Sequence, residues 1–285
     1  MQRWNTVAII GVGLIGGSIG LALRQKKLAA RVVGIGRRNG SLKAAHGLGC
    51  VSGTTTSVSR GVSRADIVVV CTPVERIPEL IAEAARHAPA GALLTDAGST
   101  KATVVAQTEA LLHAQFPGLL PYIGSHPIAG SEKAGAEAAR SDLFARRTVV
   151  VTPTASTDDQ ALASIERFWR ALGAEVVRMS PAGHDAALAR TSHLPHLVAS
   201  ALAAATPADL LPLAGSGWSD TTRVAAGDAE LWRQILAANS VHALKALADF
   251  ETVLCRLRGA LESDDGALLA EILAEGKRRR DALGS

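Results

Sequence analysis

The fold is decided by the stretch Thr6-Val7-Ala8-Ile9-Ile10-Gly11-Val12-Gly13-Leu14-Ile15-Gly16-Gly17-Ser18, close to the N-terminus. Its apolar, β-branched start predicts a buried strand, and residues 19–27 that follow it predict a helix. A Gly-x-Gly-x-x-Gly pattern between a strand and a helix is the context in which it binds a dinucleotide. Gly11 allows the tight turn, Gly13 lets the backbone approach a pyrophosphate, and Gly16 lets helix and strand pack closely. We therefore assign these glycines, with Leu14 and Ile15 between them, to cofactor binding; a glycine-rich turn without a ligand is the alternative.

Beyond this stretch, strand and helix patterns alternate as far as Met179. Strands are predicted over 31–35, 66–71, 92–95, 120–123, 148–152 and 175–179, and helices over 75–87, 103–113 and 158–172. Such alternation predicts a Rossmann-type, doubly wound, mostly parallel α/β sheet. After Pro181 only helical patterns remain, over 183–205, 228–239, 241–258 and 267–283. We therefore expect a dinucleotide-binding domain over residues 1–180 and an all-helical domain over residues 181–285 that binds substrate and dimerises.

The composition excludes several classes of protein. Of the 285 residues, 48% are apolar and 20% charged, which indicates a folded protein, and only 3% are aromatic, which leaves few platforms for single-stranded nucleic acid. The three cysteines are isolated, which favours a reducing compartment. No signal sequence and no apolar run of about 18 residues is present. We expect a cytoplasmic protein that binds neither nucleic acid nor membrane, and whose net charge of +4 helps to attract an anionic substrate.

The end of the second predicted strand, Gly34-Ile35-Gly36-Arg37-Arg38, bears on the choice of cofactor. An acidic residue at this point would accept hydrogen bonds from the adenosine ribose of NAD, and none is present. Arg37 and Arg38 stand there instead, and arginine forks onto a 2′-phosphate. The sequence therefore favours NADP over NAD. A pair of solvated arginines beside NAD, bound without an acidic partner, is the alternative.

Two polar loops follow neighbouring strands of the predicted sheet, Asp96 to Lys101 and Ser125 to Glu132. Because the carboxyl ends of parallel strands meet at one edge, we expect a hydroxyl, a lysine, an imidazole and a carboxylate to share one cleft. His126 follows a strand and precedes Pro127, so its backbone is held extended. A neutral imidazole there suits a general base at neutral pH.

Further candidates lie on the predicted helix over 183–205 and in the loop Gly215 to Arg223. His193 and His196 are three residues apart and share a helix face. Substrate contact is the preferred interpretation, ahead of a structural role and of a metal site, because no third ligand lies nearby in sequence; we expect no metal. Arg223 is either a fork for a substrate carboxylate or a salt-bridged surface arginine, and these residues alone do not separate the two.

Taken together, these blocks resemble the prephenate/arogenate dehydrogenase family of tyrosine biosynthesis. They occur in the family's order and span nearly the whole chain. The glycine motif is generic to many dehydrogenases, whereas the blocks around His126 and His193 are much more specific. The blocks are Gly11 to Ser18, Asp96 to Lys101, His126 to Glu132, His184-Asp185, Ser192 to His196, Asp220 to Arg223 and Leu231-Trp232-Arg233.

The resemblance implies the oxidative decarboxylation of a cyclohexadienol, with hydride transfer to NAD(P)+. It makes His126 the base that draws a proton from the ring hydroxyl, Ser99 a second partner of that hydroxyl, and Arg223 the clamp on a carboxylate. It also implies that the substrate pocket is lined by His193, His196 and Ser192, with Asp220 orienting His196. Glu132 would lie at the pocket mouth, and Trp232 would reach in from a partner subunit. The cofactor would be flanked by Thr72 and Pro73.

The resemblance further favours prephenate as substrate, since His196 and Glu132 resemble the members that accept it; arogenate, or both compounds, is the alternative. A β-hydroxyacid-type dehydrogenase is a more remote one. Its second domain would carry a catalytic lysine, and Lys245 is the only lysine between Lys133 and Lys277. A non-catalytic dinucleotide sensor would not need Ser99, His126 and Arg223. We expect a homodimer.

Overall fold

In the computed structural model, residues 3–115, 121–130 and 134–284 are described. The chain divides into two compact units, Met1–Asn239 and Ser240–Ser285. All candidate site residues belong to the first unit. The domain boundary expected at residue 180 stays a prediction.

The first unit is built on a sheet that, within the described residues, has eight strands in the order β3-β2-β1-β4-β5-β6-β7-β8. All neighbours run parallel except β6 and β7. This confirms the predicted Rossmann-type, mostly parallel sheet. The strands are β1 (Trp4–Ile10), β2 (Ala29–Ile35), β3 (Gly53–Thr55), β4 (Ile67–Val70), β5 (Leu93–Asp96), β6 (Tyr122–Pro127), β7 (Thr148–Thr152) and β8 (Glu175–Arg178).

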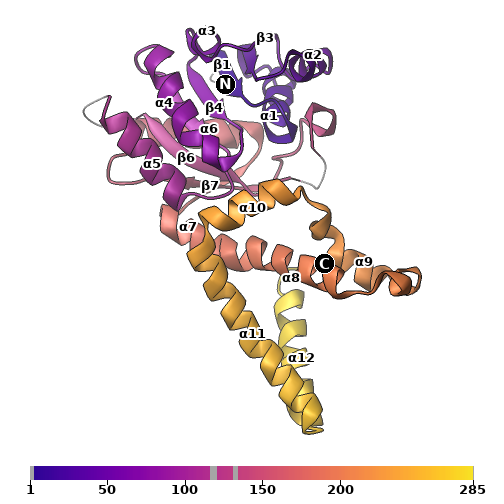
Figure 1. Cartoon of the computed structure of the whole chain (residues 1–285). Helices are drawn as coiled ribbons and strands as arrows, with labels where there is room; N and C mark the ends of the chain where they lie inside the picture. The colour runs from indigo at the N-terminus through magenta and orange to yellow at the C-terminus, as the bar shows by residue number, and fades with distance from the viewer. Residues whose placement is uncertain (1–2, 116–120, 131–133, 285) are drawn as a thin grey trace. The chain divides into compact units, whose positions relative to one another are not determined.

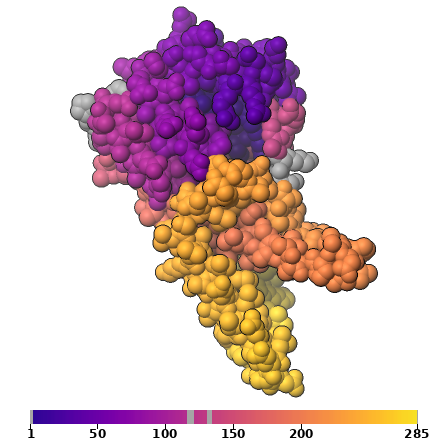
Figure 2. Space-filling model, viewed as in Figure 1, coloured from indigo at the N-terminus to yellow at the C-terminus, as the bar shows by residue number. Residues whose placement is uncertain are grey.

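Helices cover both faces of this sheet (Figure 1). Helices α1 (Leu14–Gln25) and α6 (Asp159–Leu172) pack on one face, and α3 (Val58–Val62), α4 (Ile77–His87) and α5 (Ala102–His113) on the other. Side chains of β1 alternate between the two cores, Val7 and Ile9 on the α1 side and Ala8 and Ile10 on the α4 side. The strands are buried from both sides, which explains their continuous apolar sequences. Side chains also fill the gaps between the ribbons of α4 and α5 (Figure 2).

Two features of the sheet were not predicted. Strand β3 has only three residues, Gly53–Thr55, and no apolar run to reveal it. Strand β7 runs antiparallel to β6. A parallel neighbour requires a crossover along one face of the sheet. The described part of the connection from β6 to β7 contains only the short turn η2 (Ala136–Ala138), so the chain returns in the opposite direction.

The carboxyl ends of the parallel strands lie along one edge of the sheet and carry the candidate site. Gly11 to Gly13 follow β1, Gly36 follows β2, Cys71 to Pro73 follow β4, and Ala97 to Lys101 follow β5. The helix α2 (Asn39–Gly47) and the turn η1 (Val74–Arg76) begin just beyond this edge.

The helical remainder of the first unit begins with α7 (Pro181–Leu188), which continues through the π-helical turn η3 (Ala189–His193) into α8 (Leu194–Ala205). The predicted helix over 183–205 is thus present. Pro195 does not break it, because proline near the start of α8 is tolerated and the wider turn comes just before it. The remaining elements are η4 (Ala208–Leu213), α9 (Ser216–Thr222), η5 (Arg223–Ala226) and α10 (Ala229–Ala238).

The second unit consists of two helices, α11 (Ser240–Glu262) and α12 (Gly266–Asp281). Asp265 caps α12 by accepting a hydrogen bond from the Leu268 backbone, and Arg256 approaches Glu271 at 3.5 Å. Among the residues described, no helix is long and apolar enough to cross a membrane.

Candidate active site

The glycine turn after β1 has the shape that a dinucleotide requires. Gly11 has φ +95°, and a Cβ there would lie 2.3 Å from the Cys71 carbonyl oxygen. A Cβ on Gly16 would lie 2.1 Å from the Gly11 carbonyl oxygen, so helix α1 packs as closely as only glycine permits. At Gly13 a Cβ would meet nothing within 4 Å. The start of α1 therefore faces open space, and the turn fits a pyrophosphate.

A pocket of about 330 Å³ extends from this turn to the end of β2. Arg37 and Arg38 line it and are exposed, and within the described residues their side chains have no hydrogen bond or ion pair. Thr72 lies on the other side of the turn, its methyl group 3.1 Å from where a Gly11 Cβ would stand. Pro73 follows it at the end of β4. The other lining residues are Gly11, Val12, Gly13, Gly36, Ser41, Leu42, Gly135, Ala136 and Glu137.

His126 lies near the end of β6, within the strand and not after it, and heads a chain of polar side chains. Its Nδ1 is 2.8 Å from Nε2 of His184, and Nδ1 of His184 is 2.7 Å from Asp185 Oδ1. The two rings meet edge to face at 5.0 Å between centroids. Asp185 also accepts hydrogen bonds from the backbone N–H groups of Lys101 and Ala102. This relay ties the loop after β5, strand β6 and helix α7 together.

The relay fixes the tautomer of His126. The Asp185 carboxylate only accepts, so Nδ1 of His184 carries the proton and its Nε2 is an acceptor. Nδ1 of His126 must then donate to that acceptor. Nε2 of His126 is left with a lone pair, and a general base accepts a proton at such an atom.

The charge states agree with this arrangement. Burial, followed by the charges of His184, Lys101 and His193, holds the pKa of His126 well below its ordinary value. Burial alone would raise the pKa of Asp185, but hydrogen bonds from His184 and from the Ala102 and Lys101 backbones outweigh it and bring that pKa below its ordinary value. At neutral pH Asp185 is therefore a carboxylate and His126 a neutral imidazole.

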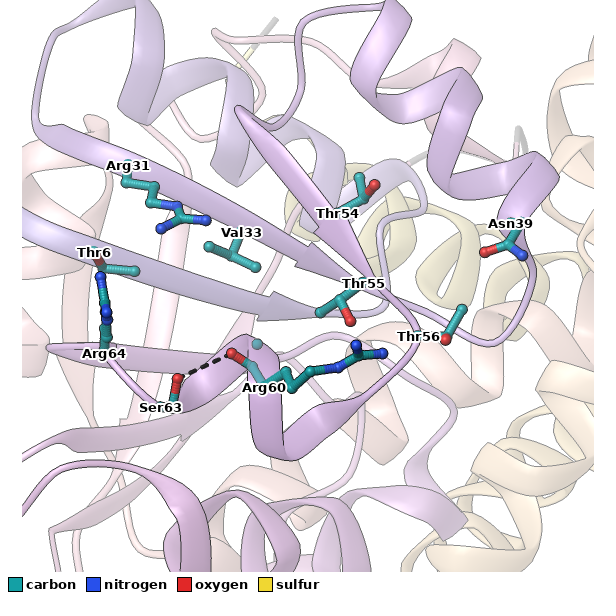
Figure 3. A pocket seen from close by; sticks show the side chains of 11 residues that line it. Thr6, Arg31, Val33, Asn39, Thr54, Thr55, Thr56, Arg60, Ser63 and Arg64 are labelled. Atoms are coloured by element: carbon teal, nitrogen blue, oxygen red, sulfur yellow. Dashed lines mark hydrogen bonds between the residues drawn. The ribbon is translucent and has the colours of Figure 1, made fainter.

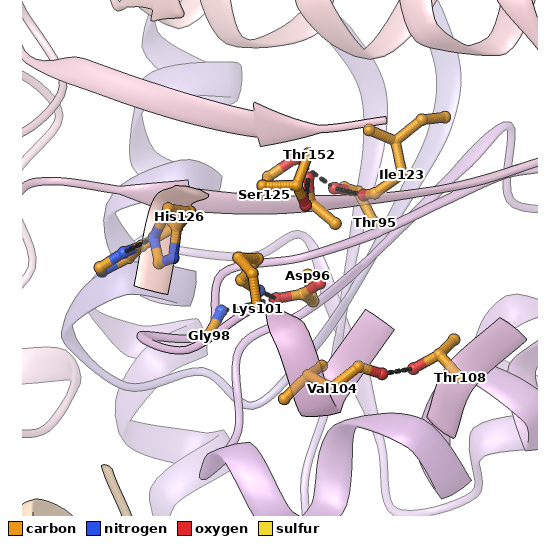
Figure 4. Close-up of polar contacts among 12 residues, drawn as sticks. Thr95, Asp96, Gly98, Lys101, Val104, Thr108, Ile123, Ser125, His126 and Thr152 are labelled. Atoms are coloured by element: carbon orange, nitrogen blue, oxygen red, sulfur yellow. Dashed lines mark hydrogen bonds and ion pairs between the residues drawn. The ribbon is translucent and has the colours of Figure 1, made fainter. Parts of the chain in front are cut away.

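Lys101 does not enter the cleft that the sequence predicted for it. Its side chain is completely buried and pairs with Asp96, next to Gly98 (Figure 4). Asp96 also accepts hydrogen bonds from the Tyr122 hydroxyl at 2.7 Å and from the Gly98 backbone at 2.7 Å. A buried charge requires such partners, and here they pin the loop after β5 against β6. Lys101 therefore holds the loop after β5 in place, through its side chain on Asp96 and through its backbone bond to Asp185.

His193 and His196 share a buried face of the α7–α8 helix. Nδ2 of Asn239 lies 3.1 Å from His193 Nδ1 and donates to the Asp185 carbonyl at 2.8 Å. Nδ1 of neutral His193 thus accepts, and its Nε2–H is a donor. Burial lowers the pKa of His193 to about 4. Burial also lowers the pKa of His196, against the opposing effect of a hydrogen bond to the Val224 carbonyl.

Trp232 lies flat on the His196 ring of its own chain, with 3.6 Å between centroids and 8° between planes, and meets His193 edge to face at 6.2 Å. Its expected contribution to a partner's site stays a prediction. The expected hydrogen bond between His196 and Asp220 is not formed: Asp220 is exposed on α9, and His196 Nδ1 is buried without a partner among the described residues.

The remaining predicted residues are placed as follows. Ser99 and Ser192 are half-buried, and neither side-chain hydroxyl has a hydrogen bond within the described chain. Arg223 is exposed and opens η5, directly after α9. Glu132 lies outside the described residues. The described residues contain no group of three or more His, Cys, Asp or Glu side chains arranged to hold a metal ion.

The sequence analysis missed three contributors to this site. His184 and Asp185 were named only as one of the blocks that carry the family resemblance, without a role for either side chain, and Asn239 was not named. An adjacent His-Asp pair at the start of a helix was the one signal for the first two. Asn239 gave no signal, because its contact with His193 spans 46 residues.

A second hollow, of about 500 Å³, lies over β2, β3 and α3 and contains none of the predicted residues (Figure 3). Arg31, Arg60 and Arg64 line it together with threonine and serine side chains. Ser63 donates to the Arg60 carbonyl at 3.1 Å within this group.

Comparison with known protein families adds to this geometry. Residues 19–178 match the prephenate dehydrogenase nucleotide-binding domain, and residues 180–275 match the prephenate dehydrogenase dimerization domain. The chain belongs to the prephenate dehydrogenase family. Within this family, it is 34% identical to prephenate dehydrogenase of Bacillus subtilis over 99% of this chain and 77% of that protein. It is 32% identical to cyclohexadienyl dehydrogenase of Zymomonas mobilis over 99% of this chain and 97% of that protein.

A solved structure of the family agrees with the fold. Prephenate dehydrogenase from Aquifex aeolicus, in complex with hydroxyphenyl propionate and NAD+, matches with a TM-score of 0.89 at 32% identity. The match covers 98% of each chain. The family, the fold and an NAD-dependent oxidoreductase activity are therefore established for this chain.

Proposed function

We propose that this chain is a prephenate dehydrogenase, which converts prephenate to 4-hydroxyphenylpyruvate and carbon dioxide in tyrosine biosynthesis. The observation that carries the proposal is the free Nε2 lone pair of His126. It is prepared by the relay to Asp185 on the same sheet edge that carries the glycine turn. A dinucleotide sensor would have no use for such a base.

The chemistry needs one proton acceptor and correct orientation. The glycine turn would hold the cofactor, and the nicotinamide ring would supply the acceptor for the hydride of the carbinol carbon. His126 takes the proton of the ring hydroxyl at Nε2 while the C–H bond breaks. Loss of carbon dioxide from the opposite ring carbon then makes the ring aromatic, and His126 returns the proton to the phenol oxygen. Substrate, oxidised cofactor and products balance with no net release of a proton.

The relay stabilises the charged form of His126 during this cycle. The imidazolium donates from Nδ1 to His184, which in turn donates to the Asp185 carboxylate. Ser99, whose hydroxyl has no partner within the described residues, is proposed to bind the same substrate hydroxyl. It thereby holds the hydroxyl in the orientation that His126 requires.

The rest of the substrate is proposed to lie against the helical part of the first unit. Arg223 clamps a carboxylate, His193 donates from Nε2, and His196 offers a buried Nδ1 that lacks a hydrogen bond within the described residues. Ser192, Glu132, Asp220 and Trp232 are proposed as further contacts. Arogenate, or both compounds, is the alternative substrate, which the similarity to a cyclohexadienyl dehydrogenase keeps open.

We further propose that NADP is the preferred cofactor. Arg37 and Arg38 line the pocket at the end of β2, where Gly36 stands instead of an acidic residue, and two guanidinium groups suit a 2′-phosphate. Leu14, Ile15, Thr72 and Pro73 complete the proposed cofactor site. A homodimer is proposed from the match to a dimerization domain, and a light-scattering mass equal to one chain would contradict it.

The test is direct. The purified chain is mixed with prephenate or arogenate and with NAD+ or NADP+, and the absorbance of the reduced nicotinamide is followed. We expect the highest kcat/KM with prephenate and NADP+. No activity with either cyclohexadienol would contradict the proposed function, and activity with arogenate alone would correct the substrate.

A further inference from the structure

The third wall of the cofactor pocket comes from a distant part of the chain. Gly135, Ala136 and Glu137 line it opposite the glycine turn and the end of β2. No sequence motif predicted a role for this segment. It follows β6 and belongs to the long connection that returns to β7.

The segment is anchored by contacts within the chain. Ala136 is buried in the core on the α1 side of the sheet. The Arg140 backbone donates to the Ser18 hydroxyl at 2.9 Å, which fixes the end of the turn to helix α1. A Cβ on Gly17 would lie only 2.9 Å from the Ala139 methyl group, so the segment and α1 are in close contact. Glu137 is therefore held beside the pocket by its neighbours on both sides.

The charges around the pocket are not neutralised by one another. Glu137 is exposed, and its carboxylate forms no hydrogen bond and no ion pair with any described residue. The same holds for Arg37 and Arg38 across the pocket, so no ion pair of 4.0 Å or less joins the two sides. The pocket thus presents one carboxylate and two guanidinium groups to the ligand that it binds.

We propose that Glu137 shifts the balance between NAD and NADP toward NAD. It supplies, from the connection between β6 and β7, the carboxylate that is missing after β2. The ribose hydroxyls are hydrogen-bond donors at the adenosine end of the cofactor, and a carboxylate can accept from them. A 2′-phosphate replaces such a donor by about two negative charges, which Glu137 repels while Arg37 and Arg38 attract them. Glu137 therefore works against the two arginines and keeps NAD+ usable.

This inference rests on the cofactor part of the proposed function, so it is tested by binding as well as by turnover. Glu137→Gln keeps the shape of the side chain and removes its charge. Dissociation constants for NAD+ and NADP+ are measured by titration of the purified chain without substrate. Glu175→Gln is the matched control. It removes the same charge, and Glu175 is also exposed but lies on β8, at the other edge of the sheet.

We expect Glu137→Gln to raise Kd for NAD+ and to lower Kd for NADP+, each by about three- to tenfold, as for one partly exposed charge-assisted hydrogen bond or charge pair. Glu175→Gln should change both constants equally and by less than about twofold. Glu137→Lys should shift the ratio further in the same direction.

A shift of both constants by the same factor in Glu137→Gln, or no shift, would overturn the proposal. Because binding is measured without prephenate, this result is distinct from a failure of the proposed reaction. A chain that binds both cofactors yet oxidises neither cyclohexadienol would contradict the proposed function. The ratio of the two dissociation constants would still decide the role of Glu137.

Discussion

The two ends of the cofactor edge differ in how their polar groups are partnered. At the end that is proposed to be catalytic, hydrogen bonds of 2.7 to 2.8 Å join His126, His184 and Asp185, and two backbone N–H groups donate to the Asp185 carboxylate. At the end that is proposed to hold the adenosine, Arg37, Arg38 and Glu137 have no polar partner in the described part of the chain.

This difference matches what each end must do. A base has to be oriented and uncharged before the substrate arrives, so its hydrogen bonds are made within the protein. Groups that select between two cofactors gain their partners from the ligand, and they contribute a difference in affinity without affecting the reacting atoms. Substitutions at the catalytic end should therefore change kcat, and those at the adenosine end should change the ratio of cofactor constants.

The largest effect is expected from His126→Asn. This change removes the proton acceptor and keeps a side chain of similar size, so kcat should fall by about 10²- to 10⁴-fold while KM for the cofactor stays near that of the wild type. Steady-state kinetics with saturating substrate measure both constants. A kcat within a few-fold of the wild type would remove His126 from the mechanism.

Asp185→Asn should come next, with kcat reduced roughly 10²-fold. The Lys101 and Ala102 backbones donate to different oxygens of Asp185, Oδ1 and Oδ2, so an amide can keep only one of these two bonds. With its oxygen toward Ala102, the NH₂ group would take the place of Oδ1 and face Nδ1 of His184. His184 would then carry its proton on Nε2, and His126 would be driven into the tautomer whose Nε2 is already protonated.

Glu166→Gln provides the control for Asp185→Asn, since Glu166 is a buried carboxylate that pairs with Arg170 and Arg178 away from the site. It should lower the thermal midpoint and leave kcat nearly unchanged. Equal losses of kcat in the two variants would show that Asp185 acts only through stability.

Arg223→Ala lies between the two ends in its expected effect. Loss of a carboxylate clamp should raise KM for prephenate by roughly 10- to 100-fold, because a fork of charge-assisted hydrogen bonds is removed. KM for the cofactor should not change. If only the cofactor constant moved, Arg223 would belong to the other part of the site.

The smallest effect is expected at the adenosine end. The double variant Arg37→Ala, Arg38→Ala should raise KM for NADP+ about tenfold and that for NAD+ less than about twofold, with kcat unchanged. Cofactor titrations at fixed prephenate measure this ratio. Equal changes for the two cofactors would show that the arginines do not contact the 2′-position.

Much of this architecture could be predicted from short-range patterns. The glycine turn, the alternating elements and the candidate base at His126 are encoded in contiguous residues whose spacing has a direct structural meaning. Strand β3 escaped because three residues, Gly53 to Thr55, carry no periodicity. The reversal of β7 depends on the path of a long connection, which local sequence does not encode.

The parts of the site that were missed depend on contacts distant in sequence. The bond from His126 to His184 spans 58 residues, and that from Lys101 to Asp185 spans 84. Lys101 looked like a cleft residue because it follows Ser99 in a polar loop, but its side chain turns inward to Asp96. A sequence pattern indicates which residues are near a strand end, whereas only the packing shows which of them face the ligand.

The pH dependence of kcat/KM for prephenate tests the central claim most directly. In the proposed mechanism the neutral form of His126 is the active one. The pKa of His126 lies well below the ordinary value of about 6.5, so the imidazole becomes protonated only at more acidic pH. The rate constant should therefore stay level from pH 8 down to about 6.5 and fall only well below that value, and His126→Asn should lose this acidic limb. A limb centred at or above pH 6.5, or one that persists in His126→Asn, would contradict the account.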